Sequence, residues 1–245
     1  IPKPHVRTQN TKNKILSIEV SDKKEEYFER ISDLFHEVRS KIQFISVAED
    51  AVHTAPKYRT PDQARMLSKV RPKQLVDRID QFKSEKEEIY QFSQFPEDEF
   101  WIVTDVDKNW SDETVNPNSH KTYKDEWENA VALCQEKNYR YAVSNPFFEI
   151  WLMLHHTTPN EVDKGFAITE THAYEKTDHF RIRLRELGVP LADKKHINPS
   201  DYDVDKVKTA VCRAEAFHKY KSDLCPNYFA TTVYILLNKI IDMLS

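Results

Sequence analysis

Short apolar segments alternate along this chain with longer segments of helical periodicity, and few folds accommodate that pattern. The apolar segments are rich in branched and aromatic residues, as buried strands are. They are Ile15–Ile18, Phe44–Ala48, Phe100–Val103 and Arg140–Val143. Strands that alternate with helices are typical of a parallel sheet with helices on both faces. The sequence therefore predicts an α/β fold whose sheet is mostly parallel.

Apolar residues at helical spacing predict the elements that connect and follow these strands. Proline at the start of the second of them fits a first helical turn, where its missing N–H is not needed. The expected helices are Glu25–Ile42, a segment after Pro72, Tyr123–Cys134, a short apolar helix after Pro146, a helix near Arg181, Asp203–Lys221 and Phe229–Leu244.

The chain is expected to be a single domain behind a short tail. Residues 1–13 carry basic but no acidic side chains and include two prolines, which indicates a basic N-terminal tail. Residues 14–245 then form the domain, with a catalytic sheet core over about 14–158. The helices over about 159–245 are expected to cover that core rather than to form a second catalytic unit.

Glycine is scarce, and its scarcity excludes several phosphate-binding loops. The chain has 2 glycines, whereas average usage would give about seventeen. Neither a G-x-G-x-x-G nor a G-x-x-x-x-G-K-[ST] motif is present. The formal net charge is −4, so a nucleic acid would have to be held by a local basic surface and not by the overall field.

Cysteine usage and hydropathy bear on the compartment. The 3 cysteines are widely spaced and form no Cys-x-x-Cys pair, which argues against a disulfide framework or a thiolate zinc site. The longest apolar stretches are too short or too polar to span a bilayer. We therefore expect a soluble protein of the reducing cytoplasm with no membrane partner.

Acidic residues stand where the predicted strands end. Glu19 ends the first strand, Asp105 and Asp107 follow Phe100–Val103, and Glu149 lies on the helix after Arg140–Val143. Ligands of open parallel sheets bind at the carboxyl ends of strands. Side chains two residues apart on an extended segment face the same side, so Asp105 and Asp107 can share one cation with Glu19. Oxygen ligands favour Mg²⁺ or Mn²⁺ over zinc.

An Asp-x-Asp sequence has other interpretations, which stay open on the motif alone. It occurs as a helix cap or a turn. It also occurs in aspartyl-nucleophile phosphatases and in metal-dependent glycosyltransferases. A glutamate ending the first strand ahead of the Asp-x-Asp, as Glu19 does here, is the arrangement of Toprim nucleotidyl-transfer domains.

Three segments resemble the RloB-like family. Residues 18–28 resemble its opening motif, in which Cys-Glu-Gly-Glu leads to Thr-Glu and then Tyr-Phe; Glu25 matches the Thr-Glu position. Residues 100–107 resemble its apolar strand that ends in Asp-x-Asp. Residues 144–155, Ser-Asn-Pro-Phe-Phe-Glu-Ile-Trp-Leu-Met-Leu-His, are very similar to its most distinctive block. Smaller similarities continue at Tyr174-Glu175-Lys176, Arg213-Ala214, Pro226-Asn227 and Thr231-Thr232-Val233.

This resemblance implies a Toprim-like, Mg²⁺- or Mn²⁺-dependent nuclease of bacterial antiphage defence, of the abortive-infection kind. Its substrate would be RNA, including tRNA, or DNA. Its partner would be an ABC- or AAA-type ATPase, RloA. A second copy of the chain is a further candidate partner. By the same resemblance, Glu19 is the general acid or base and a metal contact, Asp105 and Asp107 are metal ligands, Glu149 is an additional ligand or orienter, and Lys176 neutralises charge on the phosphate.

Two departures from the family pattern leave alternatives. Val20 stands where the family has glycine and Ser21 where it has a second glutamate, so the tight turn and one carboxylate of the motif are missing. A non-catalytic binding or regulatory subunit of the ATPase complex is one alternative. A metal-dependent phosphatase with Asp105 as nucleophile is the other.

A few other residues suggest a ligand but have ordinary explanations. Adjacent His155 and His156 point in different directions on a helix, which favours a helix-end cap or a phosphate contact over zinc. Trp101, Trp127 and Trp151 are expected in the core, whereas Trp110 lies beside the Asp-x-Asp, where it could stack on a base. Two basic segments could follow a phosphate backbone or be solvated surface: Arg59, Arg65, Lys69, Arg71 and Lys73, and Lys194-Lys195-His196.

Overall fold

Five strands form one sheet in the order β2–β1–β3–β4–β5. The computed structural model describes residues 15–19, 22–46, 72–106, 115, 120–162, 177–193, 196–223, 225–226 and 228–244; for residues 15–19, 22, 40, 43–46, 72 and 177–178 it describes the backbone alone. Neighbouring strands are parallel except at β4 and β5, which are antiparallel. The strands are β1 (Ile15–Glu19), β2 (Ile42–Ser46), β3 (Glu99–Asp105), β4 (Arg140–Asn145) and β5 (Ala230–Thr231).

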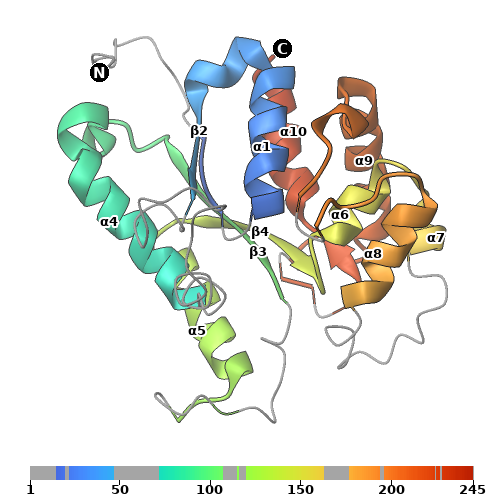
Figure 1. Ribbon diagram of the computed structural model, residues 1–245. Helices are drawn as coiled ribbons and strands as arrows, with labels where there is room; N and C mark the ends of the chain where they lie inside the picture. The colour runs from blue at the N-terminus through green and yellow to red at the C-terminus, as the bar shows by residue number, and fades with distance from the viewer. Residues whose placement is uncertain are drawn as a thin grey trace.

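Helices cover both faces of this sheet (Figure 1). One face carries α4 and α5, and the other carries α1, α6, α9 and α10. Among the described helices, none combines the length and apolarity needed to cross a membrane. The helices are α1 (Asp22–Leu34), α4 (Pro72–Tyr90), α5 (Tyr123–Glu136), α6 (Glu149–Leu154), α7 (Pro159–Val162), α8 (Thr177–Glu186), α9 (Val204–Phe217) and α10 (Val233–Asp242).

Alternation along β3 divides the apolar side chains between two cores. Phe100 and Ile102 belong to the core under α4 and α5. Trp101 and Val103 belong to the larger core under α1, α6, α9 and α10. Successive side chains of a strand point to opposite faces, so a strand covered on both sides is a continuous apolar run. The predicted α/β class and the helices on both faces are confirmed.

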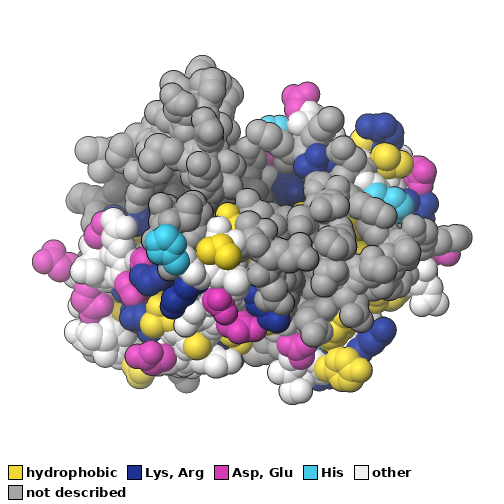
Figure 2. All heavy atoms as spheres, turned by 90° about the horizontal axis from the view of Figure 1, so that it is seen from below, with side chains coloured by type: hydrophobic (Ala, Val, Ile, Leu, Met, Phe, Trp, Pro, Cys, Tyr) yellow, Lys and Arg dark blue, Asp and Glu magenta, His cyan; other side chains and the backbone are white. Residues whose placement is uncertain are grey.

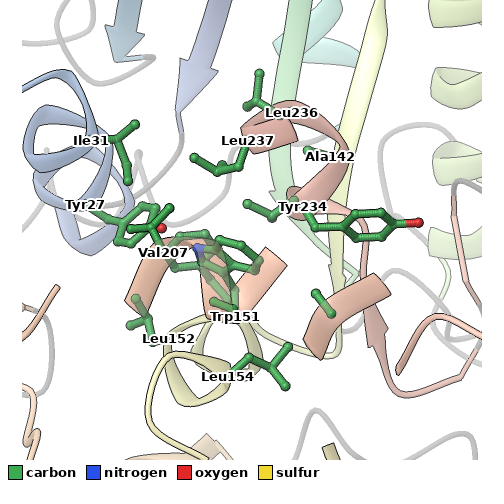
Figure 3. Close-up of a cluster of buried hydrophobic side chains, with 14 of the residues drawn as sticks. Tyr27, Ile31, Ala142, Trp151, Leu152, Leu154, Val207, Tyr234, Leu236 and Leu237 are labelled. Carbon is green, nitrogen blue, oxygen red and sulfur yellow. The ribbon is translucent and has the colours of Figure 1, made fainter. Parts of the chain in front are cut away.

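The larger core joins segments far apart in the sequence. Tyr27 of α1, Trp151 of α6 and Val207 of α9 lie together there (Figure 3). Every residue of α6 is buried, which explains why its sequence is apolar on all sides apart from Glu149. Leu237 of α10 belongs to the same cluster, so this C-terminal helix packs in the core on that face of the sheet.

Some predicted boundaries are wrong. The first helix begins at Asp22 and ends at Leu34, and a 3-10 helix (His36–Lys41) carries the chain to β2. Its i,i+3 geometry keeps Val38 on the buried side, which extends the helix-like spacing past the true helix end. Ile42 is not helical but opens β2, paired with Ile15.

Near the C-terminus, the predicted Phe229–Leu244 helix contains the short strand β5 at its start. Ala230 and Thr231 pair with Asn145 and Ser144 at the end of β4. The helix α10 begins only at Val233. Two residues are too few for a strand periodicity, so the sequence pattern could not separate β5 from the helix.

Candidate functional site

The carboxyl ends of the parallel strands meet at one edge of the sheet, and two of the predicted site residues end strands there. Glu19 is the last residue of β1 and Asp105 the last residue of β3. The two strands are adjacent, with Ile18 opposite Ile102. On the other side of β3, the ladder with β4 continues past Asp105, because the N–H of Val106 donates to the Ser144 carbonyl at 2.9 Å. Sequence and register therefore agree that Glu19 and Asp105 end neighbouring strands at the same edge.

Asp105 faces the α1 side of the sheet and forms an ion pair there. It follows Trp101 and Val103 by two-residue steps, so it shares their face. The Lys24 Nζ lies 3.1 Å from Asp105 Oδ1, and the side chains of Lys24 and Asp105 are 3% and 19% exposed. Burial raises the pKa of the Asp105 carboxyl, Lys24 and Lys23 act against that shift, and Glu149 adds to it. Asp105 and Glu149 are thus within electrostatic reach of each other.

Glu149 is the first residue of α6, and its side chain is fully buried. The ammonium of Lys23 donates to Glu149 Oε1 at 2.5 Å. Arg181 of α8 lies on the same oxygen, with its Nε 3.9 Å away. Among the residues that the structure describes, none donates a hydrogen bond to the buried Oε2. A buried carboxylate oxygen without a donor is costly unless a cation or water reaches it.

Lys23 and Lys24 lie in the first turn of α1, where cations are unfavourable. The N-terminal end of a helix carries partial positive charge and attracts anions. Consecutive helical residues are about 100° apart, which allows each lysine to reach a different carboxylate. The contacts with Asp105 and Glu149 therefore offset an unfavourable position and a loss of hydration.

The structure brings together only part of the predicted site. Asp105 and Glu149 belong to one charged cluster with Lys23, Lys24 and Arg181. Glu19 is placed by its backbone alone, and Asp107 and Lys176 lie outside the described residues. Within the described part of the chain, no group of three or more His, Cys, Asp and Glu side chains could hold a metal.

The three cations of this cluster were not predicted from the sequence. Lys23 and Lys24 lie inside the segment that resembles the family's opening motif, but the sequence predicts a helix only from Glu25, which leaves both lysines ahead of it. The true start at Asp22 brings both lysines into the first turn. The sequence predicts a helix near Arg181 but gives no reason to expect Arg181 at the site. Its approach to Glu149 depends on how α8 packs against α6.

Of the two adjacent histidines, His155 has a structural role, because both of its ring nitrogens form hydrogen bonds within the protein. The His155 Nδ1 lies 2.9 Å from the Trp151 carbonyl, which can only accept, so Nδ1 carries the proton. Nε2 then accepts from the Tyr27 hydroxyl at 3.0 Å. Burial lowers the pKa of His155 to about 3. His155 is the C-cap residue of α6, and its ring donates to the Trp151 carbonyl in the last turn of that helix. Of the two predicted roles, the helix-end cap is therefore confirmed for His155, and the phosphate contact is wrong, because the ring is neutral, buried and bonded at both nitrogens.

Of the other predicted residues, some are described by the structure and some are not. Trp101, Trp127 and Trp151 are buried, as predicted. Trp110, the basic segment up to Arg71 and Lys194-Lys195 lie outside the described residues. Seen from the side toward which β3 runs, the described surface carries Lys and Arg side chains interspersed with Asp and Glu (Figure 2). Lys73, the described member of the basic segment, is exposed and paired with Asp77 at 2.8 Å.

Comparison with known proteins gives one match. Neither the curated proteins nor the solved structures contain a match to this chain. The sequence profile of the family described as RloB-like protein matches residues 19–240. The match begins at Glu19, includes the strands β2 to β5 and contains Asp105, Glu149 and both lysines. The chain therefore belongs to the RloB-like family.

Proposed function

We propose that this protein is a Toprim-type nuclease that hydrolyses phosphodiester bonds with the help of Mg²⁺ or Mn²⁺. Its substrate is RNA, tRNA among the candidates, or DNA. It acts as the effector of an antiphage system together with an ABC- or AAA-type ATPase. The observation that carries the proposal is the pair Asp105 and Glu149 at the carboxyl edge of the sheet, beside the strand that ends in Glu19.

Two described side chains of this edge have the ligand chemistry that a hard divalent cation prefers. Asp105 and Glu149 offer carboxylate oxygens, the ligand type that Mg²⁺ and Mn²⁺ prefer. Glu149 Oε2 is buried and accepts no hydrogen bond from the described residues. Glu19 ends the adjacent strand, and Asp107 is two residues beyond Asp105 in the sequence. The bound cation would lower the pKa of a coordinated water and stabilise charge on the phosphate.

In the proposed reaction, the side chains have the following roles. Glu19 accepts the proton of the attacking water and returns a proton to the leaving oxygen. Asp105 and Asp107 would hold the divalent cation through their carboxylate oxygens, and Glu149 would be an additional ligand or orienter on α6. Lys176 stabilises the charge that develops on the phosphate. Of these residues, Asp105 and Glu149 have described side chains.

A non-catalytic subunit of the ATPase complex is the second candidate. It is favoured by the lysine on each described carboxylate and by Val20 and Ser21 in place of the family's glycine and glutamate. A site that is already neutralised and has lost one carboxylate can retain the fold without the reaction.

The decisive experiment combines metal binding with cleavage. Mg²⁺ and Mn²⁺ are titrated into the wild type and into the double variant Asp105→Ala, Asp107→Ala, and each protein is incubated with total RNA and plasmid DNA in the presence of its ATPase. The matched control is Asp77→Ala, Glu85→Ala, which removes two exposed carboxylates of α4. Circular dichroism verifies that all three proteins are folded.

The nuclease proposal expects metal binding and cleavage in the wild type and in the control, and loss of both in the site variant. Cleavage that persists in the site variant would refute it. Association with the ATPase without any cleavage by the wild type would favour the non-catalytic subunit. Hydrolysis of a small phosphoester, lost on Asp105→Asn alone, would favour the phosphatase.

A further inference from the structure

The ion pairs of Lys23 and Lys24 have no part in the chemistry proposed above. Lys24 is 2% exposed and lies 3.1 Å from Asp105. Lys23 lies 2.5 Å from Glu149, whose side chain is 0% exposed. Ammonium groups are strongly hydrated and are almost never buried without an anionic partner. The two lysines and the two carboxylates therefore depend on each other for burial.

These contacts already neutralise the carboxylates in the absence of metal. Asp105 and Glu149 contribute two negative charges, and Lys23, Lys24 and Arg181 contribute three positive charges. A divalent cation on Asp105 would lie close to the Lys24 ammonium in a site with little water. Repulsion between charges is strong where water is excluded, so the ammonium and a metal ion compete for the same carboxylate.

The two carboxylates differ in how readily a metal ion could reach them. Lys24 contacts the partly exposed Asp105 and lies 5.8 Å from the centre of the Phe148 ring. Lys23 is held at the fully buried Glu149, where Arg181 supplies further positive charge. Exchange is therefore easier at Asp105, because a cation from solvent can reach its 19% exposed carboxylate, whereas the Glu149 side chain is 0% exposed.

We propose that Lys23 and Lys24 are internal counter-cations that substitute for a divalent metal ion at Asp105 and Glu149, and that a metal ion enters by displacing the Lys24 ammonium from Asp105. The proposal rests on the metal site of the proposed function and adds a control on its occupancy. The metal-free protein stays folded because its carboxylates are neutralised by lysine. Metal affinity is held down, since each binding event must expel a buried ammonium.

The first test uses Lys24→Gln, with Lys73→Gln as the matched control because Lys73 forms an exposed ion pair with Asp77. Calorimetric titration with Mn²⁺ is expected to give at least tenfold tighter binding for Lys24→Gln than for the wild type, and an unchanged affinity for Lys73→Gln. In EDTA, Lys24→Gln is expected to unfold at a lower temperature than the wild type, and Mn²⁺ is expected to restore it. Equal or weaker Mn²⁺ binding by Lys24→Gln would overturn the proposal.

The second test needs no variant and therefore does not depend on how Lys24→Gln folds. Wild-type protein is treated briefly with an amine-acylating reagent with and without Mn²⁺, and the modified lysines are identified by mass spectrometry. Lys24 is expected to be protected in EDTA and modified with Mn²⁺, whereas exposed Lys73 is modified in both. Protection of Lys24 that is the same with and without Mn²⁺ would contradict displacement.

The outcomes separate this proposal from the function on which it rests. If the wild type binds Mn²⁺ and cleaves nucleic acid while Lys24 stays protected, the nuclease proposal stands and the exchange is refuted. If neither the wild type nor Lys24→Gln binds Mn²⁺, the metal site itself is refuted and the exchange with it.

Discussion

The buried His155 predicts a specific dependence of stability on pH. Its ring is 3% exposed and bonded at both nitrogens, to the Trp151 carbonyl and the Tyr27 hydroxyl. Burial lowers the pKa of His155 from an ordinary 6.5 to about 3. In the unfolded chain the same imidazole titrates normally, so between these two values the unfolded state binds a proton that the folded state excludes. The stabilising effect is complete above the unfolded pKa and is lost as the pH falls toward the folded pKa.

The magnitude follows from the two pKa values. Acidification from about pH 7 to about pH 5 protonates His155 almost completely in the unfolded chain and hardly at all in the folded one, which lowers the free energy of unfolding by about 2 kcal/mol. Urea unfolding followed by tryptophan fluorescence at both pH values measures this loss. His156 and His218 also have lowered pKa values through burial, so the wild type is expected to lose more than this amount in total.

The variant His155→Phe isolates the contribution of this one ring. It should lose about 2 kcal/mol less than the wild type over the same pH interval, whatever its stability at about pH 7. Tyr27→Phe is the matched control, because it removes the hydroxyl that donates to Nε2 but leaves the imidazole buried and neutral. Its pH dependence should match that of the wild type. Equal pH dependence of wild type and His155→Phe would refute the reasoning.

Three further substitutions test the packing and the ion pairs by urea unfolding. Thr122→Ala removes the capping box with Asp125 at the start of α5 and should cost about 1 kcal/mol; no loss would show that the cap is replaced by water. Leu237→Ala empties a fully buried position and should cost about 2–5 kcal/mol, with a smaller loss indicating local collapse. Lys23→Ala should lower the free energy of unfolding by roughly 3 kcal/mol, because it leaves the buried Glu149 carboxylate without its lysine. Glu149→Gln should cost less, because the 12% exposed Lys23 that it leaves unpaired can be rehydrated. A larger loss for Glu149→Gln than for Lys23→Ala would contradict this reasoning.

The framework of the fold was predictable because β3 and β4 are continuous apolar runs that end in polar residues. Such runs require cover on both faces, and Phe100 and Trp101 are accordingly buried in the two cores on opposite faces of the sheet. The ends of the elements were less predictable, since they depend on distant partners. β5 exists because Ala230 and Thr231 meet the end of β4, and no local pattern in two residues records that contact.

In the candidate site, too, one part could be predicted from the sequence and another part could not. The position of Asp105 could be predicted, because a carboxylate that directly follows an apolar strand is carried to the sheet edge by the strand itself. The positions of the cations could not be predicted, because Lys23-Lys24-Glu25-Glu26 has the composition of a solvated helix surface. The burial of Lys24 depends on Asp105, which lies on β3 and is distant in the sequence. A segment of two cations followed by two anions does not by itself indicate which charged side chain becomes buried. Here the indication lies in the helix start, since two lysines in the first turn of α1 oppose the helix dipole and require anions nearby. In a sheet of this kind, cations in the first turn after a strand therefore point to the carboxylates that they neutralise.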